Sequence, residues 1–182
     1  MMRLSVIAVV SLLTAVSAAG QRGGTATSPP PAAPKLTFVF EMHAMVGPPQ
    51  EVGQVRSGRR RIVPITGGTF EGPNFRARIL PGGADWQTIQ PDGFSELDTR
   101  YTIQTDSGGL VYVQNAGMRH AAPDVMERLL AGQVVDPALV YFRTVPRFET
   151  SAPDLQWLTR AIFIGVGERY PNEVVIRFFR LD

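Results

Sequence analysis

From residue 35 onward the sequence consists of short runs in which apolar and polar residues alternate, separated by turns rich in glycine and proline. In residues 36–43 the even-numbered positions are Leu, Phe, Phe and Met, whereas the odd-numbered ones are Thr, Val, Glu and His. Alternation with period two is the pattern of a half-buried β-strand. Further extended runs are predicted over residues 51–56, 59–66, 74–80, 84–90, 94–106, 110–113, 139–144, 161–166 and 174–181. About nine or ten strands at hairpin spacing indicate a mostly β chain.

One helix interrupts this pattern. Pro123 and Asp124 are typical of a first helical turn, Val125 begins an apolar stripe, and Gly132 ends the helix. Residues 153–158 are predicted as a turn or short helix. The predicted fold class is therefore a single antiparallel β-barrel of about 8–10 strands with one short helix. An open β-sandwich is the alternative, because it is built from strands at the same spacing.

The N-terminal residues have the pattern of an export signal. Arg3 precedes an apolar stretch over residues 6–13, and small residues follow it. A membrane anchor is the alternative, but the apolar run is shorter than the ~20 residues that a spanning helix needs. We predict a cleaved signal peptide over residues 1–19 and a disordered Pro/Gly/Ser-rich linker over residues 20–34, ahead of a barrel domain at residues 35–182. The protein is then secreted or periplasmic, without a stable membrane anchor after cleavage.

Composition narrows the chemistry. The chain has no cysteine, which excludes disulfides, thiolate nucleophiles and cysteine-ligated metals. His43 and His120 are its two histidines and lie far apart in sequence, so no metal site is predicted. Neither a Gly-x-Ser-x-Gly motif nor a phosphate-binding loop is present, and no cofactor is predicted. A formal net charge of +2, with one basic run at residues 59–61, predicts no nucleic-acid partner.

Longer motifs along the folded part carry a family resemblance. They are residues 58–73 (GRRRIVPITGGTFEGP), 80–87 (LPGGADWQ), 97–101 (LDTRY), 136–137 (DP), 141–144 (YFRT), 146–150 (PRFET), 157–158 (WL) and 163–167 (FIGVG). In this combination and order the chain resembles the family catalogued as domain of unknown function 3237, over nearly everything from Leu36 to Leu181. The resemblance implies a small antiparallel β-barrel that often self-associates and whose activity is largely uncharacterised. A homodimer is therefore a possible state.

Asp85 and Trp86, which follow the turn at residues 81–83, are the most suggestive pair for chemistry. A carboxylate beside a large aromatic at the mouth of a barrel is suited to bind a hydroxyl or to act as a base with a raised pKa. The alternative is that Asp85 caps the turn and Trp86 packs as a core plug.

A second set of candidates lies on the charged face of residues 94–106. Asp98 and Arg100 share that face and lie about 7 Å apart at two-residue spacing. In a closed barrel this face points either into the lumen, where it would bind a polar or anionic ligand, or to water as a ladder of ion pairs. Tyr101 falls on the opposite face and is expected in the core. Residues expected to join the set from neighbouring strands are Glu71, Arg76, Arg78, Arg143 and Glu149.

Three functions stay open at this point. The first is an exported barrel that binds a small polar or aromatic molecule, with Trp86, Asp98, Arg100, Glu71, Arg143 and Glu149 as ligand-binding residues. The second is an acid–base enzyme (an isomerase, dehydratase or hydrolase) with Asp85 as base and Arg100 or Arg143 orienting an oxyanion. The third is a structural or assembly role. Both site hypotheses expect Asp85, Trp86, Asp98 and Arg100 to converge on one concave pocket.

Overall fold

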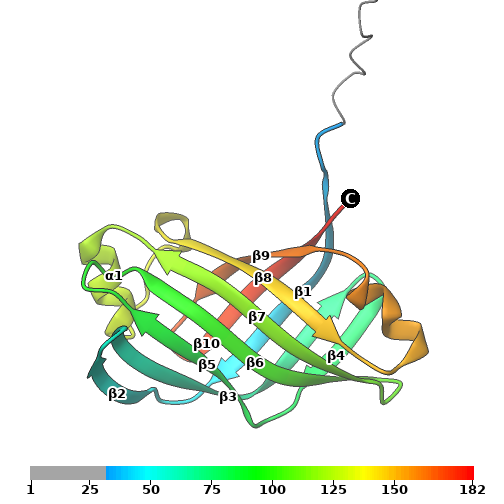
Figure 1. The fold of residues 1–182 in the computed structure, drawn as a ribbon, viewed down its shortest axis with the longest axis horizontal. Coiled ribbons are helices and arrows are strands. Elements are labelled where there is room, and N and C mark those ends of the chain that lie inside the picture. Colours follow the sequence, from blue (N-terminus) through cyan, green and yellow to red (C-terminus); the bar gives the residue numbers. More distant parts are fainter. Residues whose placement is uncertain (1–31) are drawn as a thin grey trace, which may run out of the picture. The chain divides into compact units, whose positions relative to one another are not determined.

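The computed structural model describes residues 32–182 (Figure 1). The predicted signal peptide and most of the predicted linker lie outside the described residues and stay predictions. The strands are β1 (Leu36–Val46), β2 (Gln50–Val55), β3 (Gly58–Gly72), β4 (Phe75–Ile79), β5 (Gly83–Ile89), β6 (Ser95–Thr105), β7 (Leu110–His120), β8 (Tyr141–Glu149), β9 (Phe163–Arg169) and β10 (Glu173–Leu181). Helix α1 (Pro123–Leu130) follows β7, and two 3₁₀ helices, η1 (Pro137–Leu139) and η2 (Pro153–Thr159), flank β8. None of these helices is long and apolar enough to cross a membrane.

The strands close into an antiparallel barrel, as predicted, and not into an open sandwich. Neighbours along the sheet run from β1 through β10, β9, β8, β7 and β6, and β1 also pairs with β3, which completes the circle. Strands β4 and β5 share one position, because each pairs with both β3 and β6. Strand β2 pairs with β3 beyond the end of β1. Eight strand positions therefore form the wall, and two strands are additional.

The alternation of each strand decides which side chains enter the lumen. In β6 the apolar face points inward, where Leu97, Tyr101 and Ile103 are buried. Its charged face, with Asp98 and Arg100, points outward and is accessible to water. The sequence left two orientations of this charged face open, into the lumen or toward water, and the structure has the second. The apolar face of β6 lies inside, where there is no solvent for a ladder of ion pairs.

One half of the lumen is filled by aromatic rings. Phe40 is fully buried, and its ring centroid lies 5.3 Å from that of Phe70 and 5.4 Å from that of Phe178. Helix η2 closes this end of the barrel, since its Leu155 and Leu158 belong to the same core cluster. This half is packed without room for a ligand, as the interiors of small barrels commonly are.

Helix α1 lies at the other end of the barrel, beside β2 (Figure 1). It begins with Pro123, as predicted, and buries Val125, Met126 and Leu129 in a small separate cluster. Its last turn reaches the barrel wall, because the guanidinium of Arg61 donates a hydrogen bond to the Leu130 carbonyl at 3.4 Å.

The glycine-rich run at residues 67–72 allows a close approach between strands. From the sequence, this backbone either bends sharply or passes close to a neighbour; it continues β3 without interruption against β1. A Cβ atom on Gly68 would lie 2.0 Å from the His43 carbonyl oxygen, and its φ of 138° is one that other residues rarely adopt. Glycine is therefore required where β3 crosses from β5 to β4.

Candidate functional site

The half of the lumen under α1 contains a polar cavity. Inward-facing polar side chains line it from four consecutive strand positions: Asp85 and Gln87 on β5, Thr99 on β6, Asn115 and Arg119 on β7, and Thr144 on β8. The cavity volume is about 40 Å³, and the rest of its wall is mainly apolar, from residues such as Met42, Val63, Leu97 and Phe142. A space of this size holds a few water molecules or one small polar group.

Strand register brings three of these side chains into one row. Asp85 is opposite Thr99, and Thr99 is opposite Asn115. Directly opposed residues of antiparallel strands project to the same face, with Cβ atoms about 5 Å apart. The hairpin register of β5, β6 and β7 therefore places the carboxylate, hydroxyl and amide side by side.

Asp85 is the titratable centre of this cavity. Gln87 Nε2 donates to its Oδ2 at 2.7 Å, and Thr99 Oγ1 donates to its Oδ1 at 2.9 Å. Burial raises the pKa of Asp85 above its ordinary value, and the two hydrogen bonds and the positive charge of Arg119 only partly oppose this. A carboxyl with a raised pKa exchanges protons nearer to neutral pH than an exposed one does.

Arg119 supplies the positive charge. Its side chain is 3% exposed, and its guanidinium carbon lies 5.7 Å from the centroid of the Phe142 ring. Burial lowers the pKa of Arg119 to about 10, so the group stays protonated at neutral pH. Among the described residues no carboxylate forms an ion pair with it. Buried arginines are normally paired, and this one is left free to bind an anionic oxygen.

Four buried polar atoms of the cavity lack a hydrogen-bond partner among the described residues. They are Gln87 Oε1, Asn115 Oδ1, Arg119 Nε and Thr144 Oγ1. Each belongs to a side chain that is no more than 3% exposed. An unpaired buried polar group lowers the stability of the fold by about 1–3 kcal/mol, so a cluster of four is unusual. Such a cluster points to a binding site for a polar ligand.

Tyr101 forms part of the cavity wall. Its hydroxyl donates to Met42 Sδ at 3.2 Å, and burial raises its pKa, so the phenol stays neutral. The sequence analysis expected this residue in the core, and the structure buries it there.

The predicted site residues do not converge on one pocket. Asp85 lines the cavity, but Trp86 points the other way and is 36% exposed. Asp98 and Arg100 form an ion pair with each other on the outer face, at 3.0 Å. Period-two geometry explains the split, since adjacent residues of a strand face opposite sides.

The remaining predicted residues also lie outside the cavity. Glu71 and Glu149 are exposed, and Glu71 is opposite Arg76 on β4. Arg143 stacks over the ring of Tyr141, with 4.9 Å between its guanidinium carbon and the ring centroid. A ligand-binding role for these residues is not supported by the cavity and stays a prediction.

The sequence analysis missed Gln87, Asn115, Arg119 and Thr144. The strand over residues 110–113 was predicted too short, whereas β7 runs on to His120. Extending its alternation would have placed Asn115 on the inward face of Val111 and Val113, two residues beyond Val113. A polar residue on an otherwise apolar face was the available signal.

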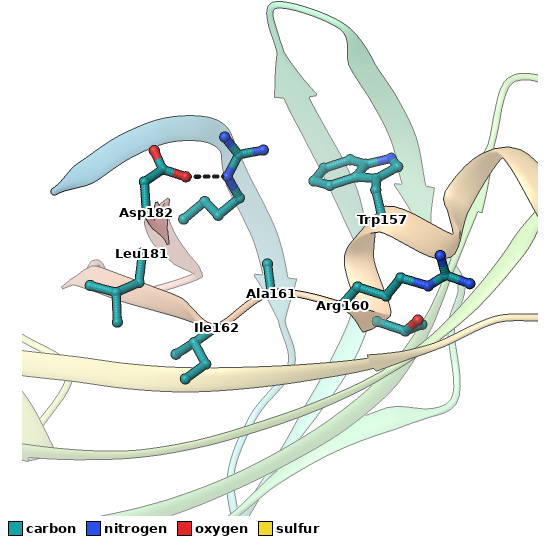
Figure 2. Close-up of a pocket in the computed structure, with 8 residues that line it drawn as sticks. Trp157, Arg160, Ala161, Ile162, Leu181 and Asp182 are labelled. Carbon is teal, nitrogen blue, oxygen red and sulfur yellow. Dashed lines mark hydrogen bonds and ion pairs between the residues drawn. The ribbon is translucent and has the colours of Figure 1, made fainter. Parts of the chain in front are cut away.

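A wider and more open hollow of about 890 Å³ lies beside η2 (Figure 2). Figure 2 shows Trp157 on one side and Leu181 and Asp182 on the other. Arg180 Nε donates to the Asp182 carboxylate at 2.6 Å, and the hydrogen bonds from Thr37 and Arg180 lower the pKa of Asp182. These polar groups satisfy one another, so the hollow offers less chemistry than the cavity. Across residues 32–182 no three acidic or histidine side chains are placed to hold a metal.

Comparisons with known proteins agree with this architecture. A UPF0311 protein of Rhodopseudomonas palustris is 44% identical over 139 residues, which cover 76% of this chain and 91% of the relative. The crystal structure of a conserved protein of unknown function from the same species superposes with a TM-score of 0.80 at 38% identity, covering 84% of this chain and all of the other.

A more distant relative is named as an enzyme. The hydroalkoxylation enzyme phnH of Penicillium herquei is 33% identical over 89 residues, or 49% of this chain and 59% of the relative. The family model described as "Protein of unknown function (DUF3237)" matches residues 34–181, which confirms the resemblance seen in the sequence. The chain therefore belongs to the DUF3237 family of β-barrel proteins, whose function is unknown.

Proposed function

We propose that the protein is an acid–base enzyme on a small molecule whose reacting polar group enters the polar half of its lumen, with Asp85 as the group that transfers the proton. The observation that carries this proposal is a carboxyl held in the cavity by Gln87 and Thr99, whose pKa burial raises. A general acid or base works best when its pKa is near the operating pH.

The arrangement is suited to moving a proton at an atom next to an oxygen. In its charged form Asp85 takes a proton from a C–H or O–H bond of the substrate, and the electron pair of that bond moves onto the substrate. Arg119 stabilises the oxyanion that results, through charge-assisted hydrogen bonds in a water-poor site. The protonated Asp85 then returns the proton to another atom of the same substrate, which leaves an isomer and regenerates the carboxylate. Arg119 takes the role that the sequence analysis gave to Arg100 or Arg143.

The distant relative supports chemistry of this kind. Hydroalkoxylation adds an O–H bond across a C=C bond, so a proton leaves oxygen and another reaches carbon. A single carboxyl that alternates between base and acid is sufficient for both transfers when the reaction is intramolecular. The resemblance thus favours a proton-transfer reaction without naming the substrate of this chain.

Binding without chemistry is the second candidate. It is favoured by the cavity volume of about 40 Å³, which admits a ligand's polar group but not a whole metabolite. In that case the four unpartnered polar atoms would serve recognition alone, and Asp85 would act only as a hydrogen-bond acceptor.

Deuterium transfer separates the two candidates. We would incubate the purified protein with a metabolite extract in D₂O and search by mass spectrometry for compounds that gain one deuterium or change retention time at constant mass. We expect such compounds with the wild type and none with Asp85→Asn, because the amide cannot carry the proton.

Asp98→Asn is the matched control, since Asp98 belongs to the same hairpin but is paired with Arg100 on the outer face. It is expected to behave as the wild type. Recovery of the same compounds, bound but unlabelled and unchanged, from both the wild type and Asp85→Asn would contradict catalysis and leave the binding function.

We also propose that this activity is located outside the cytoplasm, on the leader pattern of residues 1–19. Expression of the full chain in a Gram-negative host, followed by cell fractionation and N-terminal sequencing, tests this. A mature protein in the periplasm that begins near residue 20 is expected, whereas an uncleaved cytoplasmic product would refute export.

A further inference from the structure

Three arginines surround the α1 end of the cavity. Arg119 lines the cavity, and the strand register places Arg61 and Arg169 on the same inner face of the barrel wall. Arg61 is opposite Gln87 on β5, and Arg169 is opposite Val174 on β10. Gln87 and Val174 both line the cavity, and directly opposed residues project to the same face.

The three guanidinium groups influence one another. Burial lowers the pKa of Arg119 most, the charge of Asp85 raises it, and Arg169 and Arg61 lower it further. The pKa of Arg169 is likewise lowered, first by burial and then by Arg61, against Asp85. Like charges brought together in this way repel each other and cost free energy unless an anion joins them.

Protein groups neutralise this cluster only in part. Arg61 forms an ion pair with Glu51, and Arg169 Nη1 donates to the Glu173 carbonyl at 3.2 Å. Arg119 forms no ion pair among the described residues. Both Arg61 Nε and Arg119 Nε are buried N–H donors without a partner in the part of the chain that the structure describes. Within residues 32–182, Asp85 is the single acidic residue of the cavity wall, and its hydrogen bonds come from Gln87 and Thr99 and not from an arginine.

We infer that the substrate or ligand is a small organic anion whose charged oxygen, a carboxylate or a phenolate, binds at Arg119 with Arg61 and Arg169 beside it. This inference rests on the proposed function, because it names the substrate class of the same site. Arginine suits such oxygens, since its planar fork donates two parallel hydrogen bonds. The excess positive charge around the cavity also attracts anions from solution.

The volume of the cavity agrees with this assignment. About 40 Å³ accommodates the oxygen-bearing head of an anion beside the polar wall. The unpartnered hydroxyl of Thr144 is then available to donate to the same head group. The remainder of the ligand has to extend beyond this cavity.

Calorimetric titration of the full chain with charged and neutral probes tests the inference. The probes are formate, acetate, benzoate and 4-nitrophenolate, with benzamide as the neutral match of benzoate and inorganic phosphate as a different anion. We expect benzoate or 4-nitrophenolate to bind at least about tenfold more tightly than benzamide, as one charge-assisted hydrogen bond suffices for this. The stronger of the two identifies the head group.

Variants locate the binding. Arg119→Met is expected to abolish the preference for the anion, Arg119→Lys to retain part of it, and Arg100→Met, on the outer face, to leave it unchanged. Equal binding of benzoate and benzamide, tighter binding of phosphate than of any organic anion, or no binding of any of the organic anions at 10 mM would each overturn the inference.

The outcome is separable from that of the proposed function. Anion binding that persists in Asp85→Asn, together with no deuterium transfer in any compound, would refute catalysis while supporting the anionic ligand. Deuterium transfer to neutral compounds alone, without preference for anions, would support catalysis and refute the anionic ligand.

Discussion

The two halves of the barrel lumen are built from the same strands and packed in opposite ways. Toward η2, Phe40, Phe70, Phe163 and Phe178 are fully buried and in contact with other rings. Toward α1, the corresponding inward positions carry amide, hydroxyl, carboxyl and guanidinium groups, and some of their atoms have no hydrogen-bond partner among the described residues. The aromatic packing of the first half stabilises the folded state, whereas the buried unpaired polar groups of the second half destabilise it.

This difference separates positions that stabilise the fold from positions for which we propose a role in binding or catalysis. An all-apolar lumen is available to a barrel of this size, as its own η2 half demonstrates. Polar groups that are buried and unpaired cost stability, and folded proteins tolerate them chiefly at functional sites. The unpaired polar groups of the α1 half therefore support our proposal that the functional site lies there, and mutations in the two halves should have opposite effects on stability.

The largest expected effect is the loss of a ring from the packed half. Phe40→Ala should lower the free energy of unfolding by about 3–5 kcal/mol, because it removes a fully buried ring that the surrounding strands cannot replace. Urea denaturation measures this. Phe38→Ala is the control, since Phe38 is on the same strand but 41% exposed, and should cost far less. Equal losses in the two variants would show that the η2 half is not the core.

A smaller effect of opposite sign is expected at Asp85. A carboxyl whose pKa is raised in the folded state binds protons more readily there than in the unfolded chain, so its ionisation costs stability. Wild-type stability should therefore decrease, relative to Asp85→Asn, as the pH rises from about 4 through the raised pKa, and then level off.

Unfolding in urea at a series of pH values checks this. Only the difference between the wild type and Asp85→Asn is informative, because other carboxyls, such as Glu168, whose pKa is lowered first by its hydrogen bond from Tyr170, act in the other direction. A difference that stays constant with pH would mean that Asp85 ionises like an exposed carboxyl, and the polar half would lose its titratable centre.

The next effect isolates one unpaired group. Thr144→Val replaces a buried hydroxyl that has no hydrogen-bond partner within residues 32–182 by a methyl group of the same shape. We expect the free energy of unfolding to rise by up to about 1 kcal/mol, while anion binding weakens. Thr105→Val is the matched control and should be destabilising, because the Thr105 hydroxyl is hydrogen bonded to Ser107. Destabilisation by Thr144→Val would show that its hydroxyl is paired within the fold.

Much of this fold was predictable from the sequence. Alternation and turn residues placed nearly every strand and the helix at residue 123, because period two and glycine-rich turns are local properties. The run over residues 110–113 was predicted too short, since Asn115 and then Gly117 interrupt the apolar face of β7. That glycine is needed because a Cβ atom there would lie 2.5 Å from the Arg143 carbonyl oxygen, a contact that depends on β8.

The site was predictable only at Asp85. Which face of β6 enters the lumen is decided by the neighbours across the barrel, so the charged pair Asp98–Arg100 looked as suitable as the inward face. Arg119 was missed because its relation to Asp85 depends on two successive hairpins and their register. Pairings of this kind are properties of the closed sheet and not of any one segment.

His43 lies on the outer face of β1, between two strand residues, Met42 and Ala44, that line the cavity. Its Nδ1 is 2.8 Å from Glu173 Oε1 and its Nε2 is 2.9 Å from Glu41 Oε1. The hydrogen bond to Glu173, followed by that to Glu41, raises the pKa of His43 above 6.5.

The protonated ring should therefore stabilise the fold fully below pH 6.5, and this contribution should be lost as the pH rises through the raised pKa. With the side chain 41% exposed, solvent limits the effect to less than about 1 kcal/mol. The difference in unfolding free energy between the wild type and His43→Gln, measured from pH 5.5 to 9 in low and high salt, detects it. A difference that grows with pH would show that protonation of His43 destabilises the fold. High salt should abolish the difference between the wild type and His43→Gln, because salt screens these exposed ion pairs. It should leave the difference between the wild type and Asp85→Asn intact, because the Asp85 carboxyl is buried in a water-poor cavity.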